Sequence, residues 1–437
     1  MGRKNYFPYL TIAVIFLIML VTASNIHWGK DYWKGILGAD AKGYYAYLPA
    51  VFIYHDLNFD FFREIDQQKY YSENLYYEYR TTVDGKVINK YYCGTAAAEL
   101  PFFLIAHTAA KLLGYDADGY SKIYMVWINI GAIVYMIIGL FFLIRTLNFY
   151  KIRAWPKVVT LITVVFGTNL FYYAVKEPGM SHVYSFAFIS MFVYYAKAYL
   201  VLFPRSHIPI LSALLGIIIL IRPVNGLIIL ILPFLAGNFR ILKQGLYFLF
   251  GIRNHVLIGI LIFIAIISLQ FIIYQISTGH FFIYTYKGEG FDFLNPYFID
   301  ILFSYKKGLF LYTPIYLISF AGLYFIWKFS RFEFYSWISF FGVITYVFSS
   351  WWMWYYGGSF SSRVYVEFLP VFMILLAVAL NEIRNKFLKS SFITLIFMLI
   401  IICQVQTYQY RYYQIHWSEM NKEKYWDVFL RFDKLNK

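Results

Sequence analysis

Long apolar runs without a charged residue constrain this chain more than any other feature. Four of them cover residues 123–144, 256–279, 308–327 and 390–410. A helix of about 20 residues crosses the hydrocarbon core of a bilayer, and lipid offers the backbone no other hydrogen-bond partner. Only 14% of the 437 residues are charged, against about 25% in a soluble domain. The sequence therefore predicts an all-α protein that crosses a membrane many times.

The hydropathy pattern predicts about eleven transmembrane helices. They lie near 8–24, 121–145, 157–175, 183–203, 208–221, 223–236, 255–276, 309–327, 334–350, 364–380 and 391–407. An apolar run that follows two basic residues at the N-terminus also fits a signal peptide. Under either interpretation the residues that follow this run lie outside the cytoplasm.

Basic residues between the expected spans fall on one side of the membrane, which the positive-inside rule identifies as the cytoplasm. They are Arg3, Lys4, Arg145, Lys151, Arg153, Lys157, Arg205, Arg240, Lys243, Arg253, Lys328, Arg331, Arg384, Lys386 and Lys389. The net charge of +15 is therefore explained by topology, and no nucleic-acid partner is expected. An odd number of spans places the C-terminal tail outside.

The loop at 25–120 is the largest segment that we expect outside the membrane. An apolar, aromatic stretch at 41–54 predicts an interfacial helix, and Asp84-Gly85 between 76–83 and 86–92 predicts a β-hairpin. The stretch 95–113 is apolar enough to lie on the membrane or dip into it, and a full crossing would reverse the later topology. We expect one transmembrane domain, 1–407, with this loop inserted after its first span. An amphipathic outer tail follows at 408–437.

Two short apolar runs flank Arg222-Pro223, at 208–221 and 224–235. They form either one helix kinked at the proline or two half-spans that meet at a buried turn. A cation at membrane depth is costly without a partner, so Arg222 is a functional candidate. The alternative is an arginine that snorkels to the interface.

Short motifs occur along nearly the whole chain, on the side that we expect to be outside. They are GADAKGYY at 38–45, KYYCGT at 90–95, GTNL at 167–170, EPGMSH at 177–182, RPVN at 222–225, KGLFLYTP at 307–314, and WWMWYYGG at 351–358 followed by Arg363. In this order they resemble the GT-C superfamily of membrane glycosyltransferases, which includes protein O-mannosyltransferases and the lipid A aminoarabinose transferase. The chain is most similar to a bacterial group that is assigned to this superfamily. It departs from the pattern at Ala41, where a second acid is usual, and at Tyr92, which replaces a proline.

The resemblance implies a GT-C fold and an inverting glycosyltransferase. Such an enzyme moves a sugar from a polyprenyl-phosphate donor to a hydroxyl of a glycolipid, a polysaccharide or a protein. The site would face the periplasm at the outer surface of the bacterial inner membrane. The donor serves as a co-substrate, and no other cofactor is expected. Asp40-Ala41-Lys42 lacks the Asp-x-Asp motif that holds a metal in some relatives, so we expect no metal.

Inversion at a sugar requires a general base near the acceptor. Asp40 occupies the acid position of the superfamily and is the expected base; the alternative is a solvated loop acid or a helix N-cap. The departing phosphate requires cations or N–H groups. The candidates are Arg363, Lys306, Lys307, Arg222 and Lys42, each of which also fits an ordinary interfacial basic residue. Weaker candidates for the sugar or acceptor are His182, Glu177, Tyr44 and Trp354.

Other functional classes remain open at this point. A transporter or flippase for a lipid-linked saccharide would carry ionisable residues at the midplane of several spans and often internal symmetry. The expected spans hold few such residues, among which Arg222 and Lys197 stand out, and no internal repeat is visible. A non-catalytic GT-C relative that binds lipid or a partner fits the missing second acid. An O-antigen polymerase or ligase would carry its largest outer loop late in the chain.

Overall fold

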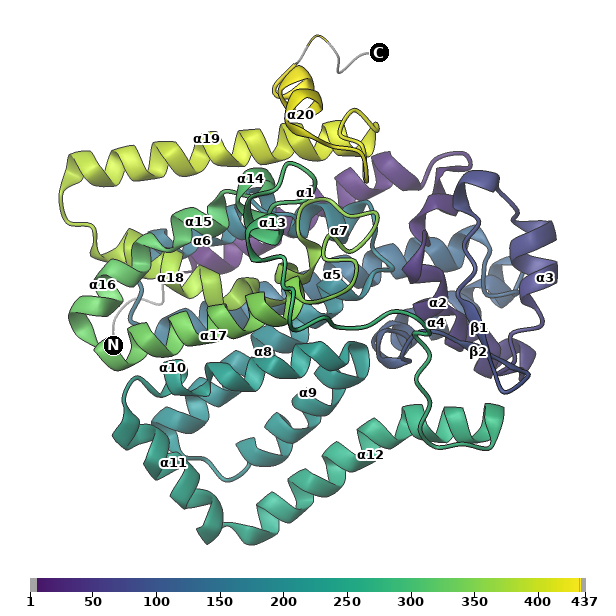
Figure 1. Ribbon diagram of the computed structural model, residues 1–437, viewed down its shortest axis with the longest axis horizontal. Helices are drawn as coiled ribbons and strands as arrows, with labels where there is room; N and C mark the ends of the chain where they lie inside the picture. The colour runs from purple at the N-terminus through teal and green to yellow at the C-terminus, as the bar shows by residue number, and fades with distance from the viewer. Residues whose placement is uncertain (1–5, 432, 434–437) are drawn as a thin grey trace.

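The computed structural model describes residues 6–431 and 433 and consists mostly of helices (Figure 1). Arg3 and Lys4, and the end of the expected tail at 434–437, lie outside the described residues. Among the described residues, seven helices are long and apolar enough to cross a membrane. They are α1 (Phe7–His27), α4 (Gly94–Leu113), α5 (Lys122–Phe149), α8 (Ser181–Leu202), α12 (Arg253–Thr278), α18 (Leu369–Glu382) with the turn before it, and α19 (Lys386–Arg411). The prediction of a mostly helical chain with several helices that could cross a membrane is confirmed.

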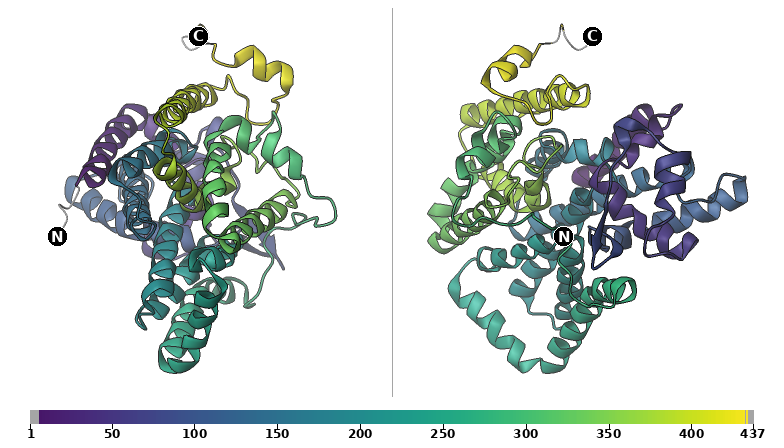
Figure 2. Two further views of the ribbon diagram at one scale, coloured as in Figure 1. Left: turned by 90° about the vertical axis from the view of Figure 1, so that its left-hand side faces the viewer. Right: turned by 45° about the vertical axis from the view of Figure 1, so that its right-hand side comes forward.

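Further helices complete the bundle. They are α6 (Ala154–Phe166), α7 (Leu170–Val175), α9 (His207–Ile221), α10 (Leu232–Ala236), α11 (Phe239–Gly251), α13 (Phe298–Phe303), α14 (Leu309–Tyr312), α15 (Ile315–Ser319), α16 (Ala321–Phe329), α17 (Arg331–Ser349) and α20 (Lys422–Val428). Helix α18 lies at the centre, and the segment Arg363–Glu382 is almost wholly buried. Helices α12 and α19 lie at the periphery and expose apolar side chains, as expected of surfaces that face lipid (Figure 2).

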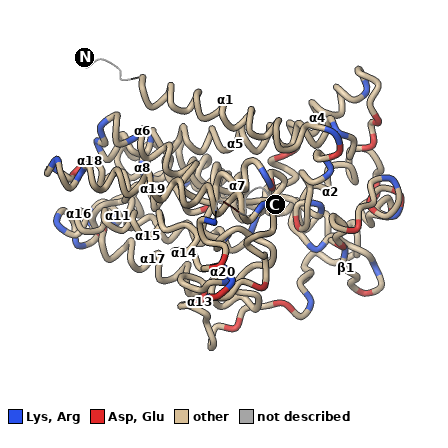
Figure 3. Tube along the Cα trace, turned by 90° about the horizontal axis from the view of Figure 1, so that it is seen from above, with Lys and Arg blue, Asp and Glu red and all other residues tan. Residues whose placement is uncertain are grey.

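The expected basic loops gather at one end of the bundle (Figure 3). Arg153, between α5 and α6, donates hydrogen bonds to Asn381 at the end of α18. Ser330, before α17, donates to the carbonyl of Gly237. Asn238, Ser330 and Asn385 cap α11, α17 and α19 there by accepting a backbone N–H. We call this the basic end.

The loop after α1 folds at the opposite end, on the right of Figure 1. It contains α2 (Asp40–Pro49), the π-helical turn Ala50–Tyr54, α3 (Phe62–Glu64) and the hairpin of β1 (Arg80–Val83) and β2 (Lys86–Asn89). Arg80 pairs with Asn89 in this antiparallel hairpin. Asp84 and Gly85 form its two-residue turn with positive φ angles of 50° and 77°, as a type I′ turn requires. The helix at 41–54 and the hairpin are confirmed as elements; the position of this helix at a membrane interface stays a prediction, and α2 is largely buried within the protein.

Helix α4 lies beside only one half of α5. Tyr135, near the middle of α5, donates a hydrogen bond to the carbonyl of Ala98. The rings of Phe103 and His107 lie against Tyr124, near the start of α5. Helix α4 therefore runs antiparallel to the half of α5 that is remote from the basic end. The expected number of eleven spans stays a prediction.

The chain reverses direction at Arg222-Pro223, so the kinked-helix alternative is wrong. Helix α9 ends at Ile221, and the backbone of Arg222 after it is extended, with φ −151° and ψ 116°. A 3₁₀ segment, Pro223–Ile231, then leads into α10 and back to the basic end, where Lys197 of α8 donates to the carbonyl of Leu235. The 15 residues of α9 extend about 22 Å, less than the hydrocarbon thickness of about 30 Å. Arg222 thus lies at a turn within the bundle.

Candidate functional site

A type II′-like turn presents Asp40 at the start of α2. The N–H of Ala41 donates to the carbonyl of Gly38, and Ala39 between them has φ 47° and ψ −128°. These angles are costly for a residue with a side chain and are tolerated where the surroundings fix them, often at functional sites. Gly43, one turn later, allows close packing, since a Cβ there would lie 2.3 Å from the ring of Tyr91.

Asp40 forms an ion pair with Arg363, which lies 323 positions away in the sequence. The Nη2 atom of Arg363 donates to Oδ2 of Asp40 at 2.8 Å. The hydroxyls of Tyr91 and Tyr77 donate to Oδ1 at 2.8 and 3.0 Å and lie 2.5 Å apart. Burial alone would raise the pKa of the Asp40 carboxyl, but the charge of Arg363 and the two tyrosine hydrogen bonds outweigh it and hold this pKa below its usual value.

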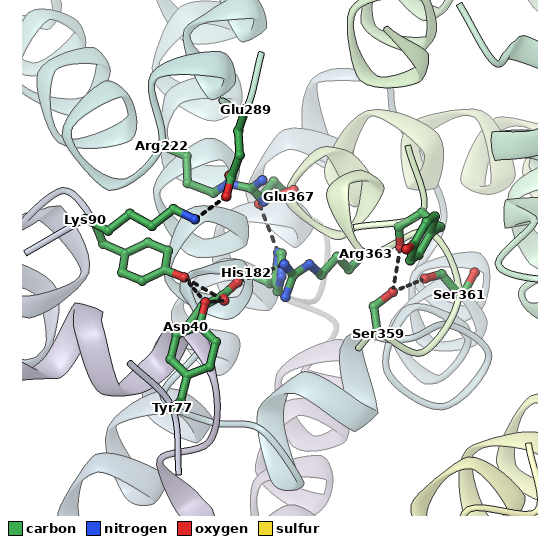
Figure 4. Close-up of polar contacts among 12 residues, drawn as sticks. Asp40, Tyr77, Lys90, His182, Arg222, Glu289, Ser359, Ser361, Arg363 and Glu367 are labelled. Atoms are coloured by element: carbon green, nitrogen blue, oxygen red, sulfur yellow. Dashed lines mark hydrogen bonds and ion pairs between the residues drawn. The ribbon is translucent and has the colours of Figure 1, made fainter. Parts of the chain in front are cut away.

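A second ion pair lies close to the first (Figure 4), and its carboxylate, that of Glu367, is fully buried. Arg222 donates through Nη1 to Oε1 of Glu367 at 2.9 Å, and Nδ1 of His182 lies 3.0 Å from the same oxygen. An ionised carboxylate only accepts hydrogen bonds, so Nδ1 of His182 carries a proton when Glu367 is ionised. Arg363 and Glu367 occupy the 3₁₀ turn Arg363–Phe368 that leads into α18. The network thus joins α2, α8, the turn after α9 and the start of α18.

Some buried polar atoms of this network have no hydrogen-bond partner among the described residues. They are Nε2 of His182, Nε of Arg363 and Oε2 of Glu367. Buried polar atoms are nearly always hydrogen-bonded in folded proteins. The site can therefore form further hydrogen bonds: the Nε–H of Arg363 can donate to a phosphate oxygen, and Nε2 of His182 can accept from a hydroxyl while Nδ1 carries the proton.

A strap formed by the loop after α12 crosses the site; we define it as residues 279–297. Lys90 pairs with Glu289 at 2.5 Å, and the hydroxyl of Thr285 donates to the carbonyl of Lys90. The ring of Tyr286 lies 6.2 Å from that of Tyr91. The strap therefore packs against Tyr91, one of the two tyrosines that hold Asp40.

Several of the residues expected from the sequence come together here. Asp40, Arg363, Arg222 and His182 belong to the two ion-pair networks. The ring of Tyr44 lies 4.8 Å from that of Tyr91, and the charges of Asp40, Arg222 and Arg363 all act on its hydroxyl.

Glu177 and Lys307 are not members of these two networks, but both feel the charge of Arg363. Glu177 accepts a hydrogen bond from Tyr172 at 2.8 Å; burial raises its pKa even though Tyr172, Arg363 and Lys176 lower it. Lys307 is 2% exposed and donates to the carbonyl of Ser359. Burial depresses the pKa of Lys307 well below its usual value, which makes it a weak candidate for holding a phosphate.

Three expected residues point elsewhere. Lys42 follows Asp40 by two positions on α2, which places it on another face of the helix, and it pairs with Asp66 at 2.5 Å. The Nζ atom of Lys306 lies 3.5 Å from the centre of the Tyr355 ring. Trp354 packs between the rings of Tyr297 and Tyr355. The structure does not bring these three into the two ion-pair networks.

No family model, no curated protein and no solved structure matches this chain. Its function must therefore be argued from the site itself. Within residues 6–431 and 433, no three side chains of His, Cys, Asp or Glu gather as a metal site would require. Metal-independent chemistry stays a prediction.

Sequence reasoning missed Glu367, Tyr77 and a role for Tyr91. Glu367 was detectable, because a carboxylate inside the expected span 364–380 is costly unless it is paired or functional. Tyr91 lies in the KYYCGT motif, but nothing in the motif indicates what its hydroxyl contacts. Tyr77 is one of 44 tyrosines, and no local signal separates it from the others.

Proposed function

We propose that this chain is an inverting glycosyltransferase that moves a sugar from a polyprenyl-phosphate donor to a hydroxyl acceptor. The acceptor is a glycolipid, a polysaccharide or a protein. The proposal includes a GT-C arrangement of about eleven spans. It also places the site at the periplasmic face of a bacterial inner membrane, opposite the basic end, which the positive-inside rule assigns to the cytoplasm.

The ion pair of Asp40 and Arg363 is the observation that carries this proposal. Transfer from a sugar phosphate requires a proton acceptor beside the attacking hydroxyl and a cation beside the departing phosphate. The pair supplies both within 2.8 Å. Arg222 adds a second guanidinium close by, and arginine suits phosphate because its planar fork of donors matches the phosphate oxygens.

The proposed chemistry uses these groups directly. The acceptor hydroxyl loses its proton to Asp40 as its oxygen bonds to the anomeric carbon. The bond from that carbon to the phosphate oxygen breaks at the same time, and the phosphate leaves with the electron pair. Arg363 and Arg222 stabilise the charge that develops on it. Attack from the face opposite the phosphate inverts the anomeric configuration.

A second candidate is a protein that binds a lipid phosphate without transferring a sugar. One observation favours it: Asp40 is already paired with Arg363, and its lowered pKa makes it a weaker base than an unpaired carboxylate. Both candidates share the phosphate site and differ in whether the sugar–phosphate bond breaks.

A transfer assay separates the two candidates. Purified protein in lipid nanodiscs would be incubated with polyprenyl-phosphate mannose, glucose, galactose or aminoarabinose in the presence of a membrane glycolipid extract. Release of free polyprenyl phosphate and the mass of the product would be measured. We expect one donor to be consumed and one glycolipid to gain the mass of its sugar. Saturable donor binding without release from any donor would favour the binding protein.

A further inference from the structure

The two arginines of the site have counter-ions that differ in access to solvent. The side chain of Glu367 is 0% exposed, whereas that of Asp40 is 16% exposed. The side chains of Arg222 and Arg363 are 17% and 12% exposed. Both arginines and Asp40 therefore present part of their side chains to solvent, while Glu367 is fully buried.

The two carboxylates also differ in what holds them. Oε1 of Glu367 contacts Arg222 and His182 at the same time, and the ring of Tyr173 lies 4.5 Å from that of His182. Removing Arg222 from Glu367 would leave a charge stranded in the protein interior, which is strongly unfavourable. Glu367 is therefore fixed in place.

Asp40 can give up its arginine at a lower cost. Tyr77 and Tyr91 both donate to Oδ1, whereas Arg363 uses Oδ2. If Arg363 moved to another anion, the two tyrosine bonds would still hold the carboxylate in position. Charge-assisted hydrogen bonds from arginine to phosphate are strong and often bidentate, so a phosphate competes well for this guanidinium.

We propose that Arg222 and Arg363 form one anion site in which Glu367 is a permanent counter-ion and Asp40 is an exchangeable one that a phosphate ester replaces on Arg363. This inference rests on the proposed function, because it takes the phosphate of the donor as the anion. The exchange links the two halves of the reaction. The donor phosphate removes the positive charge that holds Asp40 ionised, and Asp40 then binds the acceptor proton more strongly. When no phosphate is bound, Asp40 stays paired with Arg363 and does not act as a base.

Binding of a phosphate probe tests the exchange. Radiolabelled farnesyl phosphate would be titrated against the protein in nanodiscs, with farnesol as the uncharged probe. Asp40→Asn removes the internal competitor and is expected to bind farnesyl phosphate about tenfold more tightly, or better, than the wild type. Asp66→Asn is the matched control. It removes the carboxylate that pairs with Lys42, and it raises the net charge by one, as Asp40→Asn does. It should bind like the wild type, and farnesol binding should not change.

Thermal stability distinguishes the permanent counter-ion from the exchangeable one. Asp40→Asn and Glu367→Gln each leave an arginine without its counter-ion, so both should lower the melting temperature of the ligand-free protein. Farnesyl phosphate should raise the melting temperature of Asp40→Asn more than that of Glu367→Gln, because it takes the position of Asp40 on Arg363 whereas no ligand takes the position of Glu367. Equal rescue of both variants, or unchanged affinity in Asp40→Asn, would overturn the inference. Neither measurement uses sugar transfer, so a failure of the proposed function would be seen separately.

Discussion

Arg363 links the acid and the phosphate position, so its loss should affect transfer more than the loss of any cation at the basic end. We expect Arg363→Ala to lower the rate of transfer by about 10- to 100-fold, which corresponds to the roughly 1.5–3 kcal/mol of a charge-assisted hydrogen bond. Arg384→Ala removes an exposed arginine between α18 and α19 and should retain most of the rate. Initial rates in the same nanodiscs check this; equal rates for both variants would remove Arg363 from the site.

Glu177 should make the stability of the folded protein depend on pH. Its folded-state pKa is raised by burial, so the folded protein binds the proton more tightly than the unfolded chain does. The protonated group stabilises the fold at low pH, and this contribution is lost as the pH rises through the raised pKa. Glu177→Gln keeps an acceptor for Tyr172 and cannot ionise.

We therefore expect Glu177→Gln to melt at a higher temperature than the wild type at pH 8. The difference should shrink toward pH 4.5, as more of the wild-type carboxyl becomes protonated. Thermal unfolding followed by tryptophan fluorescence across this range is the measurement. A variant that is less stable than the wild type at pH 8 would show that the carboxylate is stabilising in its ionised form.

At the scale of elements, the contact between α4 and α9 positions Arg222. A Cβ on Gly94 would lie 2.2 Å from the backbone nitrogen of Ile221, the residue before Arg222. Gly94→Ala should therefore displace the end of α9 and weaken both stability and farnesyl phosphate binding. Gly342→Ala in α17 is the matched control, because nothing lies within 4 Å of its Cβ position. The control should be neutral or slightly stabilising, by up to about 1 kcal/mol. If both variants behaved alike, the contact between Gly94 and the end of α9 would not be what positions Arg222.

Elements were predictable from the sequence where the signal is local. The turn at Asp84-Gly85 and the helix at 41–54 depend on residues that are adjacent in the chain. Helix α11 was missed, because Arg240 and Lys243 were interpreted as part of a cytoplasmic loop, although this helix also exposes apolar residues such as Leu246 and Phe250. The break between α6 and α7, inside the expected span 157–175, depends on distant partners.

Asn169 illustrates such a distant dependence. Its side chain donates to the carbonyl of Phe360 and lies 3.3 Å from the hydroxyl of Tyr316. Both partners lie far away in the sequence, and no hydropathy pattern reports them. The same limit applies to the site: Asp40 and Arg363 were expected from the order of the motifs, but their direct contact is a property of the folded chain.

The whole molecule is organised by charge along one axis, with the basic end at one extreme and the site toward the other. We predict that the basic end faces the cytoplasm. A cysteine introduced at Ser72, between α3 and β1, should react with a membrane-impermeant maleimide in intact cells. One introduced at Gln244 in α11 should react only after the membrane is opened. The native Cys93 and Cys403 are buried, so labelling of the unmodified protein gives the background signal. Labelling in intact cells at Gln244 and not at Ser72 would show that the topology is the reverse of the predicted one.

The central claim is that Asp40 takes the proton of an acceptor hydroxyl during sugar transfer, and one rate comparison tests it most directly. Asp40→Asn keeps the shape of the side chain and its bonds to Tyr77 and Tyr91 but cannot accept the proton. With the donor that the wild type consumes, we predict a turnover lower by about 10²–10⁴-fold, the usual contribution of a general base. Asp56→Asn, in the same outer loop, should be mild by comparison. A folded Asp40→Asn protein that keeps most of the wild-type rate would contradict the account.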